Sequence, residues 1–196
     1  NQAPTEDVIT ELAKKNSSAP TNNGGNNEGY GTVIPDDGNG PGTVTPPPPP
    51  DPVVLKLVFA GDTILAGRVK DAVTSYGAGS YQYPFQYAAT YLKAADVAFL
   101  NLESVITDQG SADGDSALRA DPAAVNGLTY AGIDIVSVAN DHAFDYGRTG
   151  FENSLQNLTG AGIAYVGGGS FEESYTAKII EVKGCRIAFL AFTNLG

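Results

Sequence analysis

Polar side chains that can bind a cation follow three apolar segments of this chain. Short buried strands that end in carboxylates, amides and a histidine are typical of a functional site. In open α/β sheets, ligands bind beyond the carboxyl ends of the strands, so we expect the three clusters to converge on one crevice. His142 is the only histidine of the chain. The clusters are Gly61 and Asp62 after the run 57–60, Asn101 and Glu103 after the run 97–100, and Asn140, Asp141 and His142 after the run 135–139.

These donor types suit a hard or borderline divalent cation such as Mn²⁺ or Zn²⁺, which takes carboxylate, amide, water and imidazole ligands. Two such ions about 3.5–4 Å apart could hold a phosphate ester and activate a water for in-line attack. His142 could instead protonate the leaving oxygen. Glu103 has no obvious structural role one residue past an apolar strand. The candidate ligands are therefore Asp62, Glu103 and Asp141, with His142 as the candidate catalytic residue.

Each polar residue also has a structural alternative. Asp62 could cap the helix that follows it. Asn101 and Asn140 could satisfy backbone groups of their loops. Asp145 could orient the imidazole three residues before it or pair with Arg148. The chemical interpretation therefore depends on the three clusters together rather than on any one of them.

The order of expected elements after residue 53 alternates strand and helix, which indicates an α/β fold with a mostly parallel sheet. Two final apolar segments around Lys183 and Gly184 predict a β-hairpin with a tight turn. The expected strands are 55–60, 97–100, 133–138 and 163–166, the helices lie within 63–76 and at 84–94, 122–131 and 149–161, a polar loop covers 107–116, and the hairpin strands are 175–182 and 186–193.

Residues 1–52 are rich in Asn, Gly, Thr and Pro and offer little apolar surface to bury. Such a segment cannot offset the entropy of ordering itself, so we expect a flexible tether with a stiffer end at Pro46–Pro50. One short helix is expected at Glu6–Lys15. The folded part then comprises residues 53–196, and the apolar run Ile187–Phe192 near its end predicts that further residues complete the domain.

The net charge of −11 argues against a nucleic-acid partner, because phosphate contacts require a basic face. The single cysteine, Cys185, excludes an internal disulfide and a Cys-based zinc site. No run approaches the roughly 20 apolar residues of a membrane span. The chain begins at Asn1 without Met, and with its Pro-rich tether this predicts a processed, exported protein of the cell envelope.

Several segments together resemble the CapA-type capsule synthesis proteins, which are poly-γ-glutamate biosynthesis proteins related in fold to the calcineurin-like metallophosphoesterases. The resemblance runs from Leu55 to about Asn194. Its motifs are GDTILAGR at 61–68, NLES at 101–104 and ANDHAFDYG at 139–147, followed by Gly150, Gly162-Ile163 and the run 166–169.

The resemblance implies a four-layer α/β/β/α sandwich with a divalent-metal site at the strand ends. Asp62 matches the first metal-binding aspartate, Glu103 the acidic residue near the bridging position, and Asp141 with His142 the Asn-His pair of the metallophosphoesterase motif. The family usually has Asn where this chain has Asp141. Further histidine motifs of the family follow the matched segment, so this chain would hold only part of the site, and Arg68, Asn101, Asn140 and Asp145 would support the metal or contact the substrate.

Three functions follow as hypotheses. The first is an exported protein that assists the synthesis, export or anchoring of an anionic capsule polymer, in contact with that polymer or its synthesis machinery. The second is a non-catalytic envelope module, attached through the tether or self-assembled through the open edge of the last strand. The third is a phosphatase acting on small esters.

Overall fold

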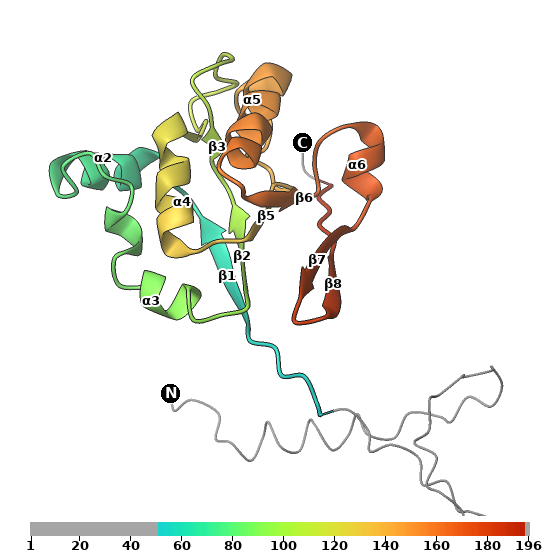
Figure 1. Cartoon of the computed structure of the whole chain (residues 1–196). Coiled ribbons are helices and arrows are strands. Elements are labelled where there is room, and N and C mark those ends of the chain that lie inside the picture. Colours follow the sequence, from blue (N-terminus) through green and yellow to red (C-terminus); the bar gives the residue numbers. More distant parts are fainter. Residues whose placement is uncertain (1–50, 195–196) are drawn as a thin grey trace, which may run out of the picture. The chain divides into compact units, whose positions relative to one another are not determined.

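A four-stranded parallel sheet forms the centre of residues 51–194, the part of the chain that this computed structural model describes (Figure 1). Its strands lie in the order β1-β2-β5-β6, and every neighbouring pair is parallel. The predicted α/β class with a mostly parallel sheet is thereby confirmed. The predicted tether, apart from its last two residues, and the expected helix at 6–15 lie outside the described residues. The strands are β1 Leu57–Thr63, β2 Val97–Leu102, β5 Ile135–Ser137 and β6 Ala164–Val166.

Helices connect the parallel strands and cover one face of the sheet. Alternate strand residues such as Leu100 and Val136 pack there against Leu128 and Leu158, all of them almost fully buried. Because successive side chains of a strand point to opposite faces, this cluster uses every second residue of the strands. The helices are α2 Gly67–Ser75, α3 Ala89–Leu92, α4 Val125–Ala131 and α5 Gly147–Gly160, with 3₁₀ turns η1 Tyr83–Phe85 and η2 Pro122–Ala124.

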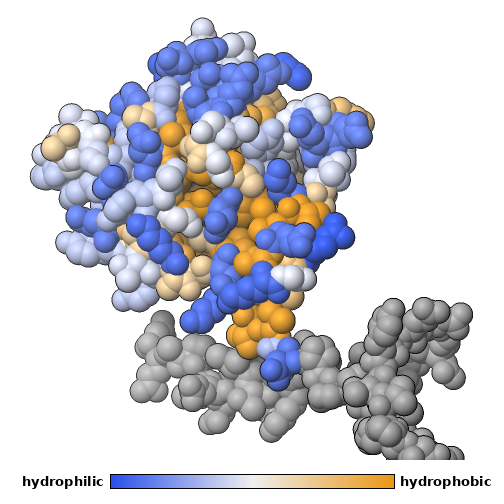
Figure 2. Space-filling model, in the orientation of Figure 1, coloured by the Kyte–Doolittle hydropathy of each residue, from blue (hydrophilic) through white to orange (hydrophobic). Residues whose placement is uncertain are grey.

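A β-hairpin packs on the other face of the sheet. It consists of β7 Lys178–Val182 and β8 Cys185–Phe189, which pair antiparallel. Lys183 and Gly184 both have positive φ, 50° and 74°, as a two-residue hairpin turn of the right-handed twist requires, and this confirms the predicted turn. Phe189 packs against sheet residues of this face and stacks on Phe99. Figure 2 shows apolar surface around the sheet and the hairpin.

Three short elements complete the described residues. A second parallel pair, β3 Val105–Ile106 and β4 Arg119–Ala120, follows the end of β2, and helix α6 Phe171–Tyr175 precedes the hairpin. Ser170 and Glu173 form a capping box that begins α6. None of these three elements was predicted from the sequence. None of the helices among residues 51–194 is long and apolar enough to cross a membrane.

The single helix predicted at 84–94 is wrong. Pro84 lies in the turn η1, where the Gln86 amide donates to the Tyr83 carbonyl, and only Ala89–Leu92 is α-helical. Phe85, Ala89 and Leu92 are all buried, so the apolar spacing that suggested one helix is satisfied by two short turns. The predicted helix at 122–131 likewise begins as a 3₁₀ turn.

Candidate functional site

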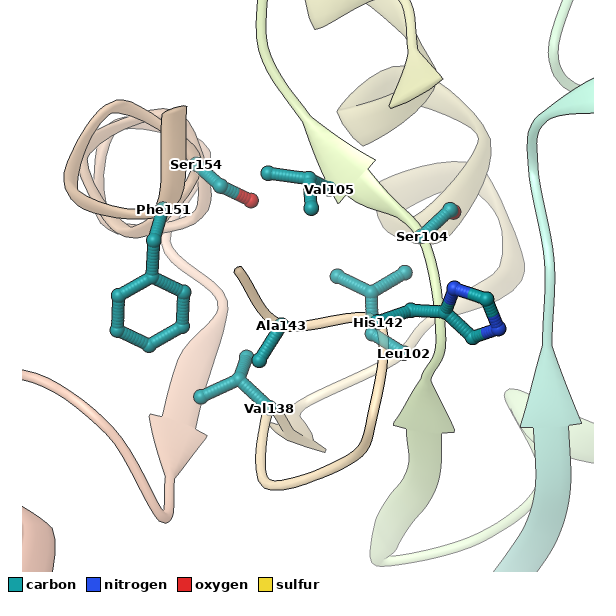
Figure 3. A pocket seen from close by; sticks show the side chains of 8 residues that line it. All are labelled: Leu102, Ser104, Val105, Val138, His142, Ala143, Phe151 and Ser154. Atoms are coloured by element: carbon teal, nitrogen blue, oxygen red, sulfur yellow. The ribbon is translucent and has the colours of Figure 1, made fainter. Parts of the chain in front are cut away.

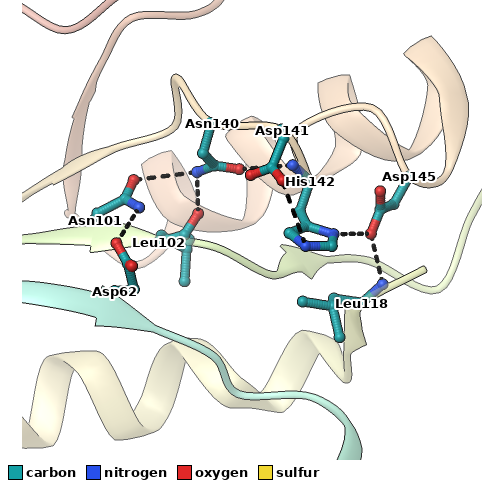
Figure 4. Close-up of polar contacts among 8 residues, drawn as sticks. All are labelled: Asp62, Asn101, Leu102, Leu118, Asn140, Asp141, His142 and Asp145. Atoms are coloured by element: carbon teal, nitrogen blue, oxygen red, sulfur yellow. Dashed lines mark hydrogen bonds and ion pairs between the residues drawn. The ribbon is translucent and has the colours of Figure 1, made fainter. Parts of the chain in front are cut away.

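The three polar clusters meet beyond the carboxyl ends of β1, β2 and β5, as the strand-end argument predicted (Figure 4). Asn101 Nδ2 donates a hydrogen bond to Asp62 Oδ1 at 2.8 Å. Asn140 Nδ2 donates to Asn101 Oδ1 at 3.1 Å and to the Leu102 carbonyl at 2.9 Å. The backbone amide of His142 donates to Asn140 Oδ1 at 3.2 Å. Side-chain amides therefore connect the ends of three neighbouring strands.

A bulge in β1 brings Asp62 into this chain of hydrogen bonds. Phe59 lies opposite Phe99, but Asp62, rather than Gly61, lies opposite Asn101 two positions further along β2. The extra residue on β1 is a β-bulge, a device that redirects side chains next to functional sites. As a result, the Asp62 carboxylate reaches the Asn101 amide.

Glu103, Asp141 and His142 form the part of the site that fits a cation. Each offers one ligand atom, and these atoms lie within 4.8 Å of one another. His142 Nε2 is 3.9 Å from Asp141 Oδ2. Two carboxylates and one imidazole are a donor set for a borderline divalent ion such as Mn²⁺ or Zn²⁺. Asp62, also expected to be a ligand, does not belong to this group of three.

Asp145 orients the imidazole of His142. Its Oδ2 atom lies 2.8 Å from His142 Nδ1 and accepts a hydrogen bond of 2.6 Å from the Leu118 amide. Of the two alternatives for Asp145, the structure shows the first, because Arg148 pairs with Glu152 instead. An Nδ1–H donated to Asp145 leaves the lone pair of Nε2 directed toward Asp141, as a metal-binding histidine requires.

The carboxylates and the imidazole influence one another's charge. Burial raises the pKa of Glu103, and the negative charges of Asp62 and Asp141 raise it further, against the opposing effect of His142. Burial lowers the pKa of His142, but the hydrogen bond and charge of Asp145, with the charges of Asp141 and Glu103, outweigh it and leave this pKa raised. A cation bound here would reduce the repulsion between Glu103 and the neighbouring carboxylates.

A small cavity lies behind His142 (Figure 3). Its volume of about 10 Å³ is close to the space of one water molecule. Ser104 Oγ accepts a hydrogen bond from the Leu65 amide, and Ser154 Oγ accepts one from the Ile106 amide. The cavity is therefore a packing gap rather than a substrate site. Its lining residues are Leu102, Ser104, Val105, Val138, His142, Ala143, Phe151 and Ser154.

The site differs from the prediction at two residues. Arg68, expected near the substrate, is exposed, and among residues 51–194 its side chain has no hydrogen bond or ion pair. The Leu118 amide, in contrast, holds Asp145 and was not expected, because a backbone donor leaves no trace in residue type. Only its position after the polar loop 107–116 could have suggested that this segment returns to the site.

The chain is similar to known capsule synthesis proteins. The family model described as bacterial capsule synthesis protein PGA_cap matches residues 56–195. The chain therefore belongs to this family. It is 30% identical over 146 residues to the capsule biosynthesis protein CapA of Bacillus anthracis, covering 71% of this chain and 35% of that protein. It is 30% identical over 147 residues to the PGA biosynthesis protein CapA of Bacillus subtilis, covering 72% of this chain and 38% of that protein.

A shorter similarity links the chain to Mycobacterium tuberculosis. Over 98 residues it is 35% identical to a probable polyglutamine synthesis accessory protein, covering 46% of this chain and 25% of that protein. The matched part of this chain thus spans about a third of the length of the two CapA relatives.

Proposed function

We propose that this chain forms part of an exported protein that assists the synthesis, export or anchoring of an anionic capsule polymer of the poly-γ-glutamate type. Two relatives that cover most of the chain carry names that refer to the capsule or to PGA. A metal-dependent, hydrolase-like site at the strand ends acts in this role. The observation that carries the proposal is the convergence of Glu103, Asp141 and His142 within 4.8 Å.

The carboxylates of Glu103 and Asp141 and the Nε2 atom of His142 would hold the ion, and Asp62 adds negative charge beside Glu103. When bound there, Mn²⁺ or Zn²⁺ would supply Lewis-acid chemistry for an ester or amide substrate. Asp145 holds the imidazole in one orientation. The amides of Asn101 and Asn140 fix the turn that carries His142, so the ligands need little reordering when the cation binds.

The alternative role for His142 in the proposal is that of proton donor to a leaving oxygen instead of metal ligand. Its raised pKa favours the protonated form that this role needs, and the same form cannot bind a metal. The two roles differ in what the variant H142Q changes. A ligand role predicts weaker metal binding in H142Q, whereas a proton-donor role predicts unchanged metal binding and lost activity in the full-length protein.

Metal binding is tested by calorimetric titration of the chain with Mn²⁺ and Zn²⁺. E103Q and D141N should each weaken binding by about 10-fold to 100-fold, because each removes a charged ligand. D71N is the matched control, since Asp71 is an exposed carboxylate on α2 outside the site. If the unsubstituted chain binds neither ion, or if D71N weakens binding as much as E103Q, the metal site is wrong.

The role in capsule synthesis is tested with the full-length protein. A strain that lacks the gene should make or retain less polymer, and full-length protein should restore it. If the E103Q and D141N variants restore polymer as well as the unsubstituted protein, the site does not act in this role. A non-catalytic module is then favoured, and the exposed apolar residues Phe59 and Phe192 provide the surface for assembly.

A further inference from the structure

A pocket of mixed charge lies between helix α2 and strand β4. Its volume is about 220 Å³. Two basic residues, Lys70 and Arg119, and two acidic residues, Asp108 and Asp121, line it together. The remaining lining residues are Thr107, Ala120 and Pro122.

The charges of this pocket are not neutralised by one another. Among residues 51–194, neither Lys70 nor Arg119 forms an ion pair, although two carboxylates line the same pocket. Arg119 is instead held with its guanidinium 4.4 Å from the centre of the Tyr146 ring, a cation–π contact that keeps its donors available. Asp121 uses Oδ1 to accept from the Ala123 amide, and its other oxygen has no partner in the described part of the chain.

The pocket is joined to the candidate metal site through two consecutive residues. Asp145 contacts His142 on one side, and the next residue, Tyr146, contacts Arg119 on the other. Leu118, whose amide binds Asp145, directly precedes Arg119. A ligand in the pocket therefore touches Arg119, which contacts the residue next to Asp145.

We propose that this pocket binds the amino-terminal residue of a γ-linked glutamate chain. This inference rests on the proposed function for the class of polymer. In a γ-linked chain, each internal residue exposes an α-carboxylate, but its nitrogen is part of an amide bond. Only the amino-terminal residue carries an ammonium and a carboxylate on the same carbon. A pocket that offers cations and carboxylates together matches that end of the chain and not its interior.

The contacts follow from the charges. The α-carboxylate lies against Lys70 and Arg119, and the α-ammonium lies against Asp108 and the free oxygen of Asp121. Charge-assisted hydrogen bonds of this kind are stronger than neutral ones. The net charge of the chain is −11, so an anionic polymer is repelled by most of its surface. A localised pair of cations is then the place where such a polymer is held.

The test uses a synthetic γ-linked glutamate trimer with a free amino terminus and the same trimer with an acetylated amino terminus. Binding to the chain of residues 1–196 is followed by amide chemical shifts. The free trimer should bind, and acetylation should weaken binding by about tenfold, since it removes the ammonium and its charge-assisted bonds. Equal binding of the two trimers would show that the pocket does not recognise the amino terminus.

Variants of the pocket separate specific binding from general attraction. K70A/R119A should lose at least about tenfold in affinity for the free trimer. The control K178A/R186A removes the same charge from exposed positions of the hairpin, and its affinity should stay within about twofold. D108N should reduce the preference for the free amine. If the control loses as much affinity as K70A/R119A, the attraction is non-specific and the inference fails.

A parallel Mn²⁺ titration keeps this inference distinct from the metal proposal. A chain that binds Mn²⁺ but not the trimer overturns the pocket inference and leaves the metal site standing. A chain that binds the trimer through Lys70 and Arg119 but not Mn²⁺ supports the pocket and overturns the metal site.

Discussion

The two faces of the central sheet are covered in different ways. On the helix side, residues of the four central strands, of β3 and β4 and of helices α2 to α5 form one continuous cluster, in which Leu100 and Leu128 are 1% and 0% exposed. On the hairpin side, the cluster of buried residues consists of Val97, Ile135, Val166 and Phe189. Parallel strands need long crossover connections, and here the helices in these connections cover one face of the sheet. Among residues 51–194, the hairpin alone covers the other face, so the apolar surface of β1 stays partly open.

The exposed fractions of three phenylalanine side chains show how incompletely the hairpin covers its face of the sheet. Phe59, Phe99 and Phe189 form one group, with ring centres 5.7 to 6.4 Å apart. Phe189 is 7% exposed, but Phe59 on the edge strand is 62% exposed. Phe189 therefore contributes to the core, whereas Phe59 forms part of the apolar surface.

The largest effect is expected on the helix side. Leu128→Ala should lower the free energy of unfolding by about 3 kcal/mol, because Leu128 is fully buried in the helix-side cluster and its truncation leaves a cavity there. Urea denaturation followed by circular dichroism measures this change. A loss below about 1 kcal/mol would mean that the helix layer is loosely packed, and the contrast between the two faces would disappear.

On the hairpin side, Phe189→Ala should cost about 2 kcal/mol, because its neighbours lie beside open surface and can move into the space. Phe59→Ala is the matched control, and should cost less than about 1 kcal/mol since most of this ring is already exposed. The same denaturation measurement applies. Equal losses for the two phenylalanines would show that Phe59 is covered in solution.

The contribution of the strand-end residues to the free energy of unfolding should depend on pH. The pKa of His142 is raised above its ordinary value of 6.5, so its interaction with Asp145 stabilises the fold below that value. This stabilisation is lost as the pH rises through the raised pKa. The difference in unfolding free energy between the unsubstituted chain and D145N should therefore be larger at about pH 5.5 than at about pH 8, with a chelator present. A difference that does not change with pH would contradict the pairing.

The smallest effect is expected at Tyr81, which packs in the helix-side cluster. Its hydroxyl is buried and makes no hydrogen bond of good geometry within residues 51–194, although the backbone of Asp121 lies near it. Tyr81→Phe should change the free energy of unfolding by no more than about 0.5 kcal/mol, or stabilise the chain, because no hydrogen bond is lost. Destabilisation by more than about 1 kcal/mol in thermal unfolding would indicate a bound water or another partner for this hydroxyl.

Much of this fold follows from local patterns. The alternation of apolar runs with amphipathic segments predicted the parallel sheet, and Lys183-Gly184 predicted the hairpin turn. The convergence of Asp62, Asn101 and Asn140 followed from one rule about strand ends. These predictions succeed because strand polarity and turn chemistry depend on residues close together in the sequence.

Features that depend on distant partners could not be predicted. The bulge before Asp62 is visible only in the register against β2, and strict alternation would place Asp62 and Phe59 on opposite faces. Strands β3 and β4 are two residues each, too short for any periodic pattern. The third case is local: Asp145 pairs with His142, and Arg148 pairs with Glu152 four residues further along α5. Contacts with distant strands decide the first two cases, whereas the third is a choice between two local pairs.

The hydrogen bond from Leu118 to Asp145 also makes this amide a natural spectroscopic probe. Its 2.6 Å bond ends on the same carboxylate oxygen that meets the imidazole of His142. Any change of charge on His142 alters the electron density of that oxygen, and the amide proton of Leu118 senses it. This backbone resonance, one residue before Arg119, therefore reports occupancy at the strand ends without a label on either the ligand or the histidine.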